Sequence, residues 1–320
     1  MKRILVVYYT QSGEVGRAIK SFTKFLNAPS IELTWQCIKP EKNYPYPWKL
    51  YNFFDVFPEC INEEPPDIEP PSFDSNTKFD LIILAYQVWF LSPSLPIQAF
   101  LKSDHAKVLR NTKIITLVVC RNMWHSSSEI IKKMINKLGG IHIDNVVVTH
   151  QGTPLLTFIT TPRLLLTGKK DKFLGALPPG GVRDDEIDAL SRFGRQIVNN
   201  LGSLSNSSHQ PLFTGLDAVE VNSRYIIPEI IGRFAYSLWA KLARFFGKPG
   251  SWSRQPIIYL FVVNLLLALP IVLLCSMLLR VLLYPLIHRK LESYVDTLKS
   301  PSEVPKRPEY KISPRFRGEL

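Results

Sequence analysis

Residues 3–16 read RILVVYYTQSGEVG, and this stretch decides the fold. The apolar run at 3–9 is typical of a β-strand that is buried on both faces. Apolar residues then recur at helical spacing from Val15 to Phe25, which predicts a helix over 14–26. A buried strand, a short polar turn and a helix in this order form the first half of a βαβ unit.

The alternation of strand and helix continues to about residue 200. Since strands that alternate with helices form parallel sheets covered on both faces, we predict a flavodoxin-type, doubly wound, five-stranded α/β domain over 1–201. Residues 40–77 are rich in proline and aromatic residues, and we interpret them as an insertion positioned to cover a site. The further strands are expected at 31–38, 80–86, 113–120 and 141–149, and the further helices at 95–102, 127–138 and 184–201.

Composition excludes several classes of protein. Four cysteines lie far apart without a CxxC pair, and six histidines are scattered, so we expect neither a disulfide framework nor a metal site. The net charge is +12, but much of the positive charge flanks an apolar segment near the C-terminus. An anionic membrane surface explains that placement better than nucleic acid does.

The turn after the first strand has the features of an anion site. Small hydroxyl residues hydrogen-bond a phosphate without bulk, Gly13 permits close backbone approach, and the N-terminus of the next helix attracts negative charge. The turn contains no lysine, so it is not a P-loop, and it is not a G-x-G-x-x-G motif. The residues concerned are Thr10, Gln11, Ser12, Gly13, Glu14 and Val15.

This turn resembles the Thr/Ser-x-Thr-Gly-x-Thr/Ser loop with which the flavodoxin family holds the phosphate of FMN. Thr10, Ser12 and Gly13 match the first, third and fourth positions of that motif. Val15 stands where the family has its last hydroxyl, so one phosphate contact is missing. An ordinary polar turn that caps a helix is the alternative, and the turn alone does not decide between them.

Two later loops resemble the flavin-contacting loops of flavodoxin-like quinone reductases. The second loop follows the third predicted strand, and the third loop follows the fourth. The resemblance implies that the second loop meets the edge of the isoalloxazine, with Trp89 or Phe90 stacked on the ring, and that the third loop contacts the flavin. The residues are Gln87, Val88, Trp89 and Phe90 in the second loop, and Cys120, Arg121, Asn122 and Trp124 in the third.

Proton carriers are expected beside these loops, because a flavin performs the redox chemistry and the protein moves protons and orients the substrate. His125 and Tyr86 are the catalytic candidates, followed by His150. Arg121 is a candidate for stabilising an enolate or the anion of the reduced flavin. Cys120 ends a strand and is expected in the core.

The C-terminal third has a different character. Residues 202–227 are polar and are interpreted as a linker, and 228–246 form a basic, aromatic helix suited to a membrane interface. Residues 256–287 are almost entirely apolar and are predicted to anchor the chain, within a unit of 228–290, and 291–320 are expected to be an extended basic tail. Because basic residues flank both ends, we expect a helical hairpin that turns near Pro270 on the cytoplasmic side of the membrane.

These features together predict an FMN-dependent oxidoreductase that acts on a lipophilic small molecule at a membrane surface. The layout is similar to that of bacterial dialkylresorcinol-synthesis proteins, which implies oxidative aromatisation of a dialkyl cyclohexane-1,3-dione beside a ketosynthase partner. An NAD(P)H:quinone reductase and a membrane-tethered electron carrier are the alternatives, as is a flavodoxin-like scaffold without FMN. Flavodoxin-like quinone reductases commonly form homodimers, but no residue here marks an interface.

Overall fold

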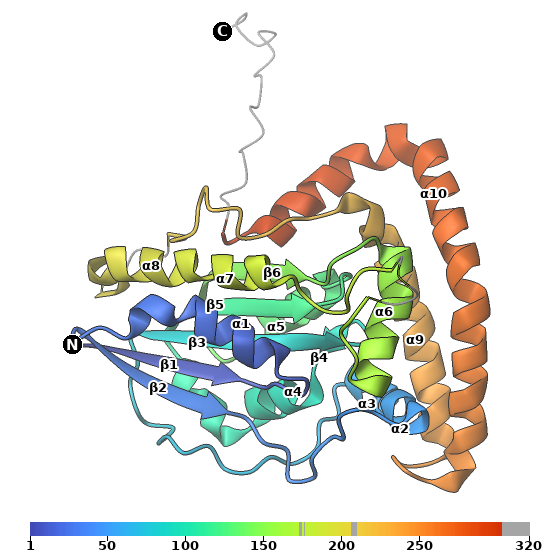
Figure 1. The fold of residues 1–320 in the computed structure, drawn as a ribbon, viewed down its shortest axis with the longest axis horizontal. Coiled ribbons are helices and arrows are strands. Elements are labelled where there is room, and N and C mark those ends of the chain that lie inside the picture. Colours follow the sequence, from blue (N-terminus) through green and yellow to red (C-terminus); the bar gives the residue numbers. More distant parts are fainter. Residues whose placement is uncertain (173–174, 176, 206–209, 303–320) are drawn as a thin grey trace, which may run out of the picture.

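A five-stranded parallel sheet forms the centre of the molecule (Figure 1). The computed structural model describes residues 1–302 except 173–174, 176 and 206–209, and at 154–155, 205, 269–270, 273, 276–281 and 283–287 it describes the backbone alone. The strands pair in the order β2-β1-β3-β5-β6, which is the flavodoxin type of doubly wound sheet. Their bounds are β1 Lys2–Tyr8, β2 Ile31–Cys37, β3 Leu81–Trp89, β5 Lys113–Cys120 and β6 Ile141–Thr149.

Helices cover both faces of this sheet. On one face lie α1 (Glu14–Phe22), α7 (Asp184–Ala189) and α8 (Ser191–Asn199), and on the other lie α4 (Leu95–Lys102) and α5 (His125–Lys137) (Figure 1). The helix predicted over 14–26 ends as a 3₁₀ turn, and the one predicted over 184–201 is divided between α7 and α8. The 3₁₀ turns are η1 Lys24–Leu26, η2 Asp104–Leu109, η3 Leu201–Ser205, η4 Ser223–Tyr225 and η5 Trp252–Arg254.

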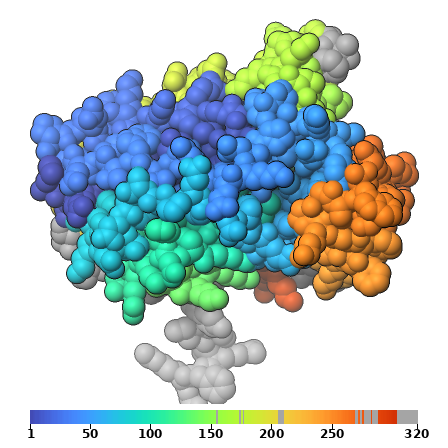
Figure 2. Space-filling view, turned by 90° about the horizontal axis from the view of Figure 1, so that it is seen from below, coloured from blue at the N-terminus to red at the C-terminus, as the bar shows by residue number. Residues whose placement is uncertain are grey.

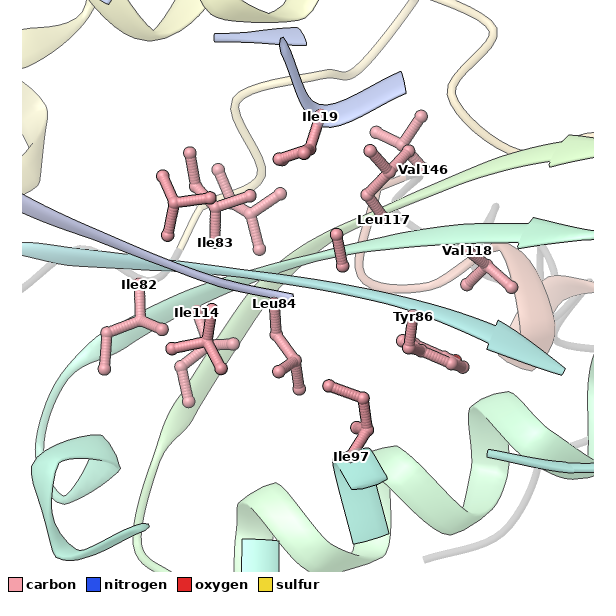
Figure 3. Close-up of a cluster of buried hydrophobic side chains, with 14 of the residues drawn as sticks. Ile19, Ile82, Ile83, Leu84, Tyr86, Ile97, Ile114, Leu117, Val118 and Val146 are labelled. Carbon is pink, nitrogen blue, oxygen red and sulfur yellow. The ribbon is translucent and has the colours of Figure 1, made fainter. Parts of the chain in front are cut away.

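Successive side chains of β3 point to opposite faces and explain why its sequence is apolar throughout. Ile83 lies on the side of Ile19 from α1, whereas Ile82 and Leu84 lie on the side of Ile97 from α4 (Figure 3). All five side chains are fully buried. A strand covered on both faces has no solvated side, so the pattern contains no polar alternation.

Three segments differ from the prediction. Strand β3 continues to Trp89 and turns back into β4 (Ser92–Pro93), so the second loop is largely a short hairpin. The insertion 40–77 contains two helices, α2 (Leu50–Asp55) and α3 (Phe57–Asn62). Helix α6 (Pro154–Thr167) was not predicted, because Pro162 inside it interrupts the helical signal.

The stretch 202–227 is not a free linker. Phe213, Ala218 and Val219 are buried in the core, and the N–H of Val147 in β6 donates to the carbonyl oxygen of Ala218. The carboxylate of Asp144 accepts the N–H groups of Leu212 and Phe213 within this segment. The few apolar residues of this segment pack along β6, the edge strand of the sheet.

A helical hairpin does form at the C-terminus, but its turn lies at 247–254 and not near Pro270. Helix α9 (Ile226–Phe246) lies beside the first arm of α10 (Gln255–Lys299), and we call this pair the C-terminal hairpin (Figure 1). Helix α10 continues through Pro270 without a turn, and it bends between its first arm and the second arm that returns to the α/β domain (Figure 1).

The second arm of α10 returns to the α/β domain. Leu298 is buried in the main core, and Ser302 exchanges hydrogen bonds with the backbone of Asn145 at 2.6 Å. The chain is therefore helical to Lys299, where an extended tail was expected, and the rest of that tail, 303–320, lies outside the described residues. Within the described part of the chain, none of the helices combines the length and hydropathy needed to cross a bilayer.

Candidate functional site

Three loops meet at the carboxyl edge of the sheet, as the sequence predicted. The first loop follows β1, the second follows β3 and the third follows β5, and these strands are successive neighbours. The winding direction reverses between β1 and β3, which opens a crevice at that edge. Ligands of open α/β sheets bind in this crevice.

The first loop forms the start of α1 with an open anion cradle. Gly13 has φ +83° and precedes the helix, and a Cβ there would meet nothing within 4 Å. Thr10 Oγ1 accepts the N–H of Gly16 at 3.2 Å, whereas the hydroxyl of Ser12 makes no hydrogen bond in the described structure. The first-turn N–H groups of a helix have no acceptor inside the helix, so they are available to an anion.

Glu14 points away from this cradle into a buried cluster. One carboxylate oxygen lies 2.9 Å from His150 Nε2, and the other accepts the N–H of Val182 at 2.9 Å and lies 3.4 Å from Lys170 Nζ. Burial acts to raise the pKa of Glu14, but these three partners outweigh it and hold the pKa at about 2. The carboxylate is thus compensated and does not repel an anion at the first loop.

The second loop is a hairpin turn under backbone strain. Phe90 and Leu91 both have positive φ, 48° and 61°, which side chains of this size rarely adopt. Arg233 of α9 holds the turn by donating to the carbonyl oxygen of Leu91 at 3.2 Å and to Ser92 Oγ at 2.8 Å. The C-terminal hairpin therefore positions the second loop.

The predicted stacking residues are already packed by the insertion. Trp89 is 8% exposed, and the rings of Tyr44 and Trp48 meet it edge-on at 5.1 and 5.7 Å. Trp48 Nε1 also donates to Gln11 Oε1 at 2.9 Å, which ties the insertion to the first loop. Phe90 packs against Phe53 at 5.0 Å. The insertion covers the site and packs against both predicted rings, of which Trp89 is buried and Phe90 is partly buried.

Helix α6 covers the third loop. The Arg121 guanidinium lies 3.9 Å over the ring of Phe158, and Asn122 Nδ2 donates to Thr157 Oγ1 at 3.4 Å. No carboxylate of the described chain pairs with Arg121, and burial lowers the pKa of its guanidinium. Cys120 is buried, as expected, and burial raises the pKa of its thiol.

Unpartnered polar atoms collect at the second and third loops. Gln87 Nε2, Arg121 Nη1 and Asn122 Oδ1 are buried and have no hydrogen-bond partner in the described structure. A buried donor or acceptor without a partner costs about 1–3 kcal/mol, so such groups call for a ligand. The open cradle of the first loop suits the phosphate of FMN, and these atoms offer donors and an acceptor of the kind that a flavin ring edge requires.

The candidate proton carriers have different surroundings. His125 is 3% exposed, and its Nδ1 lies 2.9 Å from the Glu229 carboxylate of α9, at ion-pair distance but without hydrogen-bond geometry. His150 engages Glu14 through Nε2 and Thr161 through Nδ1. Tyr86 lies wholly in the core beneath the sheet (Figure 3), where burial raises the pKa of its hydroxyl, so it cannot exchange protons with solvent.

A polar cavity of about 670 Å³ lies beside the third loop. Arg121, Asn122 and Trp124 line it together with His125 and His150, and no residue of the first or second loop does so. The structure therefore brings the third-loop residues to a cavity that the other two loops do not share. Val15 of the first loop and Val88 of the second loop are apolar and offer no side-chain hydrogen bond to a ligand.

Several residues that contact the site were not predicted from the sequence. Tyr44, Trp48, Glu229 and Arg233 come from segments far along the chain from the loops that they contact. The density of aromatic residues in the insertion was a usable signal for Tyr44 and Trp48. No local pattern distinguishes Glu229 and Arg233 from other charges on an amphipathic helix.

A comparison with solved structures finds flavoproteins and flavodoxins of low sequence identity. The chain is similar to a flavoprotein from Lactobacillus acidophilus in complex with FMN, with 20% identity over 46% of this chain and 93% of that chain, and a TM-score of 0.38. It is also similar to a WrbA-like flavodoxin from Agrobacterium tumefaciens, with 10% identity over 64% and 100% of the two chains and a TM-score of 0.36.

A flavodoxin from Fusobacterium nucleatum bound to flavin mononucleotide has 13% identity over 48% of this chain and 73% of its own, with a TM-score of 0.26. No family model and no curated protein matches the chain. With TM-scores below 0.5 these likenesses add nothing to the strand order, which by itself identifies the type of sheet.

Proposed function

We propose that the protein is an FMN-dependent oxidoreductase whose lipophilic substrate reaches it at a membrane surface. The observation that carries the proposal is the edge where the open anion cradle of α1 lies next to loops with buried, unpartnered polar atoms. The strand order alone does not establish FMN binding, because the same order occurs in proteins that bind other ligands. Bound FMN would supply a carrier of two electrons.

The chain's own residues would bind and enclose the cofactor. The N–H groups at Ser12 to Val15 and the Ser12 hydroxyl would hold its phosphate, and the insertion would exclude water from the flavin. Arg121 supplies a cation without a carboxylate partner near the third loop. The coverage by the insertion and α6 argues against an electron carrier, which must present its flavin edge to a partner protein.

Flavin binding tests the proposal directly. The full chain, purified in detergent and mixed with FMN, is expected to retain flavin absorbance after gel filtration. Ser12→Glu is expected to weaken FMN binding at least about tenfold, because it places a carboxylate in the phosphate cradle, and to leave riboflavin binding unchanged. Ser30→Glu, at the opposite edge of the sheet, is the matched control. A colourless protein that cannot be loaded would exclude the proposal.

The narrower form of the proposal is the oxidation of a dialkyl cyclohexane-1,3-dione to a dialkylresorcinol. The dione would lose a hydride and a proton and become aromatic, and His125 and His150 are the histidines placed near the third loop to take up the proton. Anaerobic bleaching of the flavin-loaded protein by such a dione tests this form. Bleaching by NADPH alone would favour the quinone-reductase alternative instead.

A further inference from the structure

A second cavity, of about 500 Å³, lies between the insertion and the turn of the C-terminal hairpin. Its volume is typical of small-molecule sites. Figure 2 shows the surface of this region, with the insertion in light blue beside the orange hairpin turn. Apolar and aromatic side chains form most of its wall, namely Tyr44, Pro45, Trp48, Tyr51, Val56, Pro65, Pro66, Leu95 and Pro249.

The carboxylates in the wall already have cationic partners. Asp55 and Glu59 are both paired with the buried guanidinium of Arg254, at 2.7 and 2.9 Å, and Glu64 pairs with Arg244 at 2.9 Å. The remaining charge is the exposed Lys42, which has no ion pair among the described residues. Such a wall favours a neutral ligand over a cation, because a cation would lose its hydration and meet only carboxylates that are already paired.

Among the aromatic side chains of the wall, Tyr44 has the polar group that is available. Its hydroxyl makes no hydrogen bond within the described chain, and burial raises its pKa, so it remains a donor at neutral pH. The hydroxyl of Tyr51 already donates to Asp55, and the indole N–H of Trp48 donates to Gln11. A ligand that accepts a hydrogen bond, such as a carbonyl compound, suits the Tyr44 hydroxyl.

The cavity lies between the exposed apolar side chains of the C-terminal hairpin and the second loop. On the outer side, Tyr51 contacts Tyr259, which is 49% exposed on α10, at 5.9 Å between ring centroids. On the inner side, Tyr44 and Trp48 separate the cavity from Trp89. Aromatic rings thus lie on both sides of the cavity, towards the exposed side of α10 and towards the proposed flavin site.

We propose that this cavity binds a neutral, lipophilic carbonyl compound taken from the membrane, with its oxygen accepting the Tyr44 hydroxyl. The cavity alone supports the existence of a binding site. Its identification as the substrate site rests on the proposed function. The ligand's apolar part packs against Trp48 and the prolines of the insertion.

Quenching of tryptophan fluorescence by decylbenzoquinone tests the site, because Trp48 lines it. The full chain in detergent, with and without FMN, is expected to show saturable quenching that Trp48→Phe largely removes. Tyr44→Phe keeps the ring and is expected to weaken quinone binding up to about tenfold, through loss of one hydrogen bond. Decylbenzene, which has no acceptor, is expected to compete equally well for both proteins.

Two variants of α2 provide a matched pair. Asn52→Phe fills the cavity and is expected to abolish saturable quenching, whereas Lys49→Phe, on the same segment but outside the wall, is expected to bind as the wild type does. Unchanged quinone affinity in both Tyr44→Phe and Asn52→Phe would overturn the inference. Cavity-dependent binding in a protein that takes up no FMN would support the site and exclude only the proposed function.

Discussion

Glu14 shows how a single residue of the first loop links two ends of the site. Its carboxylate is 5% exposed and joins the loop after β1 to His150, which follows β6, and to the N–H of Val182. In sequence it looked like one member of an anion-binding turn. Its folded partners also make it the residue that links the first loop to the segment after the edge strand β6 and to Val182.

The depressed pKa of Glu14 predicts acid sensitivity. The pKa is about 2 in the folded protein, against an ordinary value of 4.5 for a glutamate. A carboxyl group with a lowered folded pKa stabilises the fold above its unfolded pKa, and this contribution, about 3 kcal/mol, is lost as pH falls from 4.5 towards 2. We expect Glu14→Gln to flatten the dependence of the unfolding free energy on pH in that window, measured by urea unfolding.

Glu32→Gln is the control for this prediction. Glu32 pairs with Arg3 on the surface at 3.4 Å, where such a pair contributes about 0–1 kcal/mol. The unfolding free energy of Glu32→Gln is expected to depend on pH in the same way as that of the wild type. Parallel curves for wild type and Glu14→Gln would show that the buried cluster does not hold the carboxylate as described.

Among the elements, the C-terminal hairpin and the insertion depend on each other. Phe57 of α3 stacks on Phe261 of α10 at 4.0 Å, and both belong to a separate small core with Ala240 and Ala243 of α9. Neither α2 nor α3 has a long amphipathic pattern, since each has six residues. The hairpin buries Phe57 and Ile61, and the main core buries Cys60, so contacts with distant segments hold these short helices, which explains why the sequence of the insertion did not predict them.

The buried arginine of this interface gives a second prediction. Arg254 is 0% exposed and pairs with Asp55 and Glu59, so its removal leaves the Asp55 carboxylate buried without a cation and leaves Glu59 with Arg244 alone, at 3.3 Å. We expect Arg254→Ala to lower the unfolding free energy by about 3–5 kcal/mol. Arg244→Ala removes partly exposed pairs with Glu59 and Glu64 and is expected to cost about 0–1 kcal/mol. Equal losses for the two variants in denaturant unfolding would refute the distinction.

At the scale of the whole molecule, the exposed apolar side chains gather on the C-terminal hairpin. Phe234, Leu238 and Phe245 of α9 are 67%, 54% and 85% exposed, and α10 continues the surface with Leu260, Val263, Leu266 and Leu267. Lys241 and Lys248 lie beside them and are exposed. An apolar surface of this kind with basic neighbours suits an anionic bilayer interface.

Membrane binding is therefore the prediction at this scale. The chain is expected to float with phosphatidylcholine vesicles in a sucrose gradient, and more strongly when phosphatidylglycerol is included, by about 1 kcal/mol for each lysine near the surface. Phe245→Ser is expected to reduce binding at least about tenfold, because it removes a side chain that the bilayer would bury. Trp35→Ser, an exposed aromatic on β2, is the control, and equal losses for both would contradict a specific membrane face.

The α/β domain and the edge of the sheet that carries the site could be predicted from the sequence alone. Continuous apolar strands such as 3–9 and 113–120 have one stable environment, a sheet covered on both faces, so their pattern sufficed to predict five parallel strands. The three loops followed, because the carboxyl ends of parallel strands share one edge.

Only the tertiary structure decided what covers that edge. The packing of Trp48 on Trp89, the hold of Arg233 on the strained turn at Phe90, and the position of the hairpin turn at 247–254 all depend on contacts between distant segments. Local periodicity reports which side of an element is buried, but not which element buries it. The aromatic loop residues that the sequence assigned to a flavin were therefore found packed against the insertion, while buried polar atoms at Gln87 and Asn122 remained without partners.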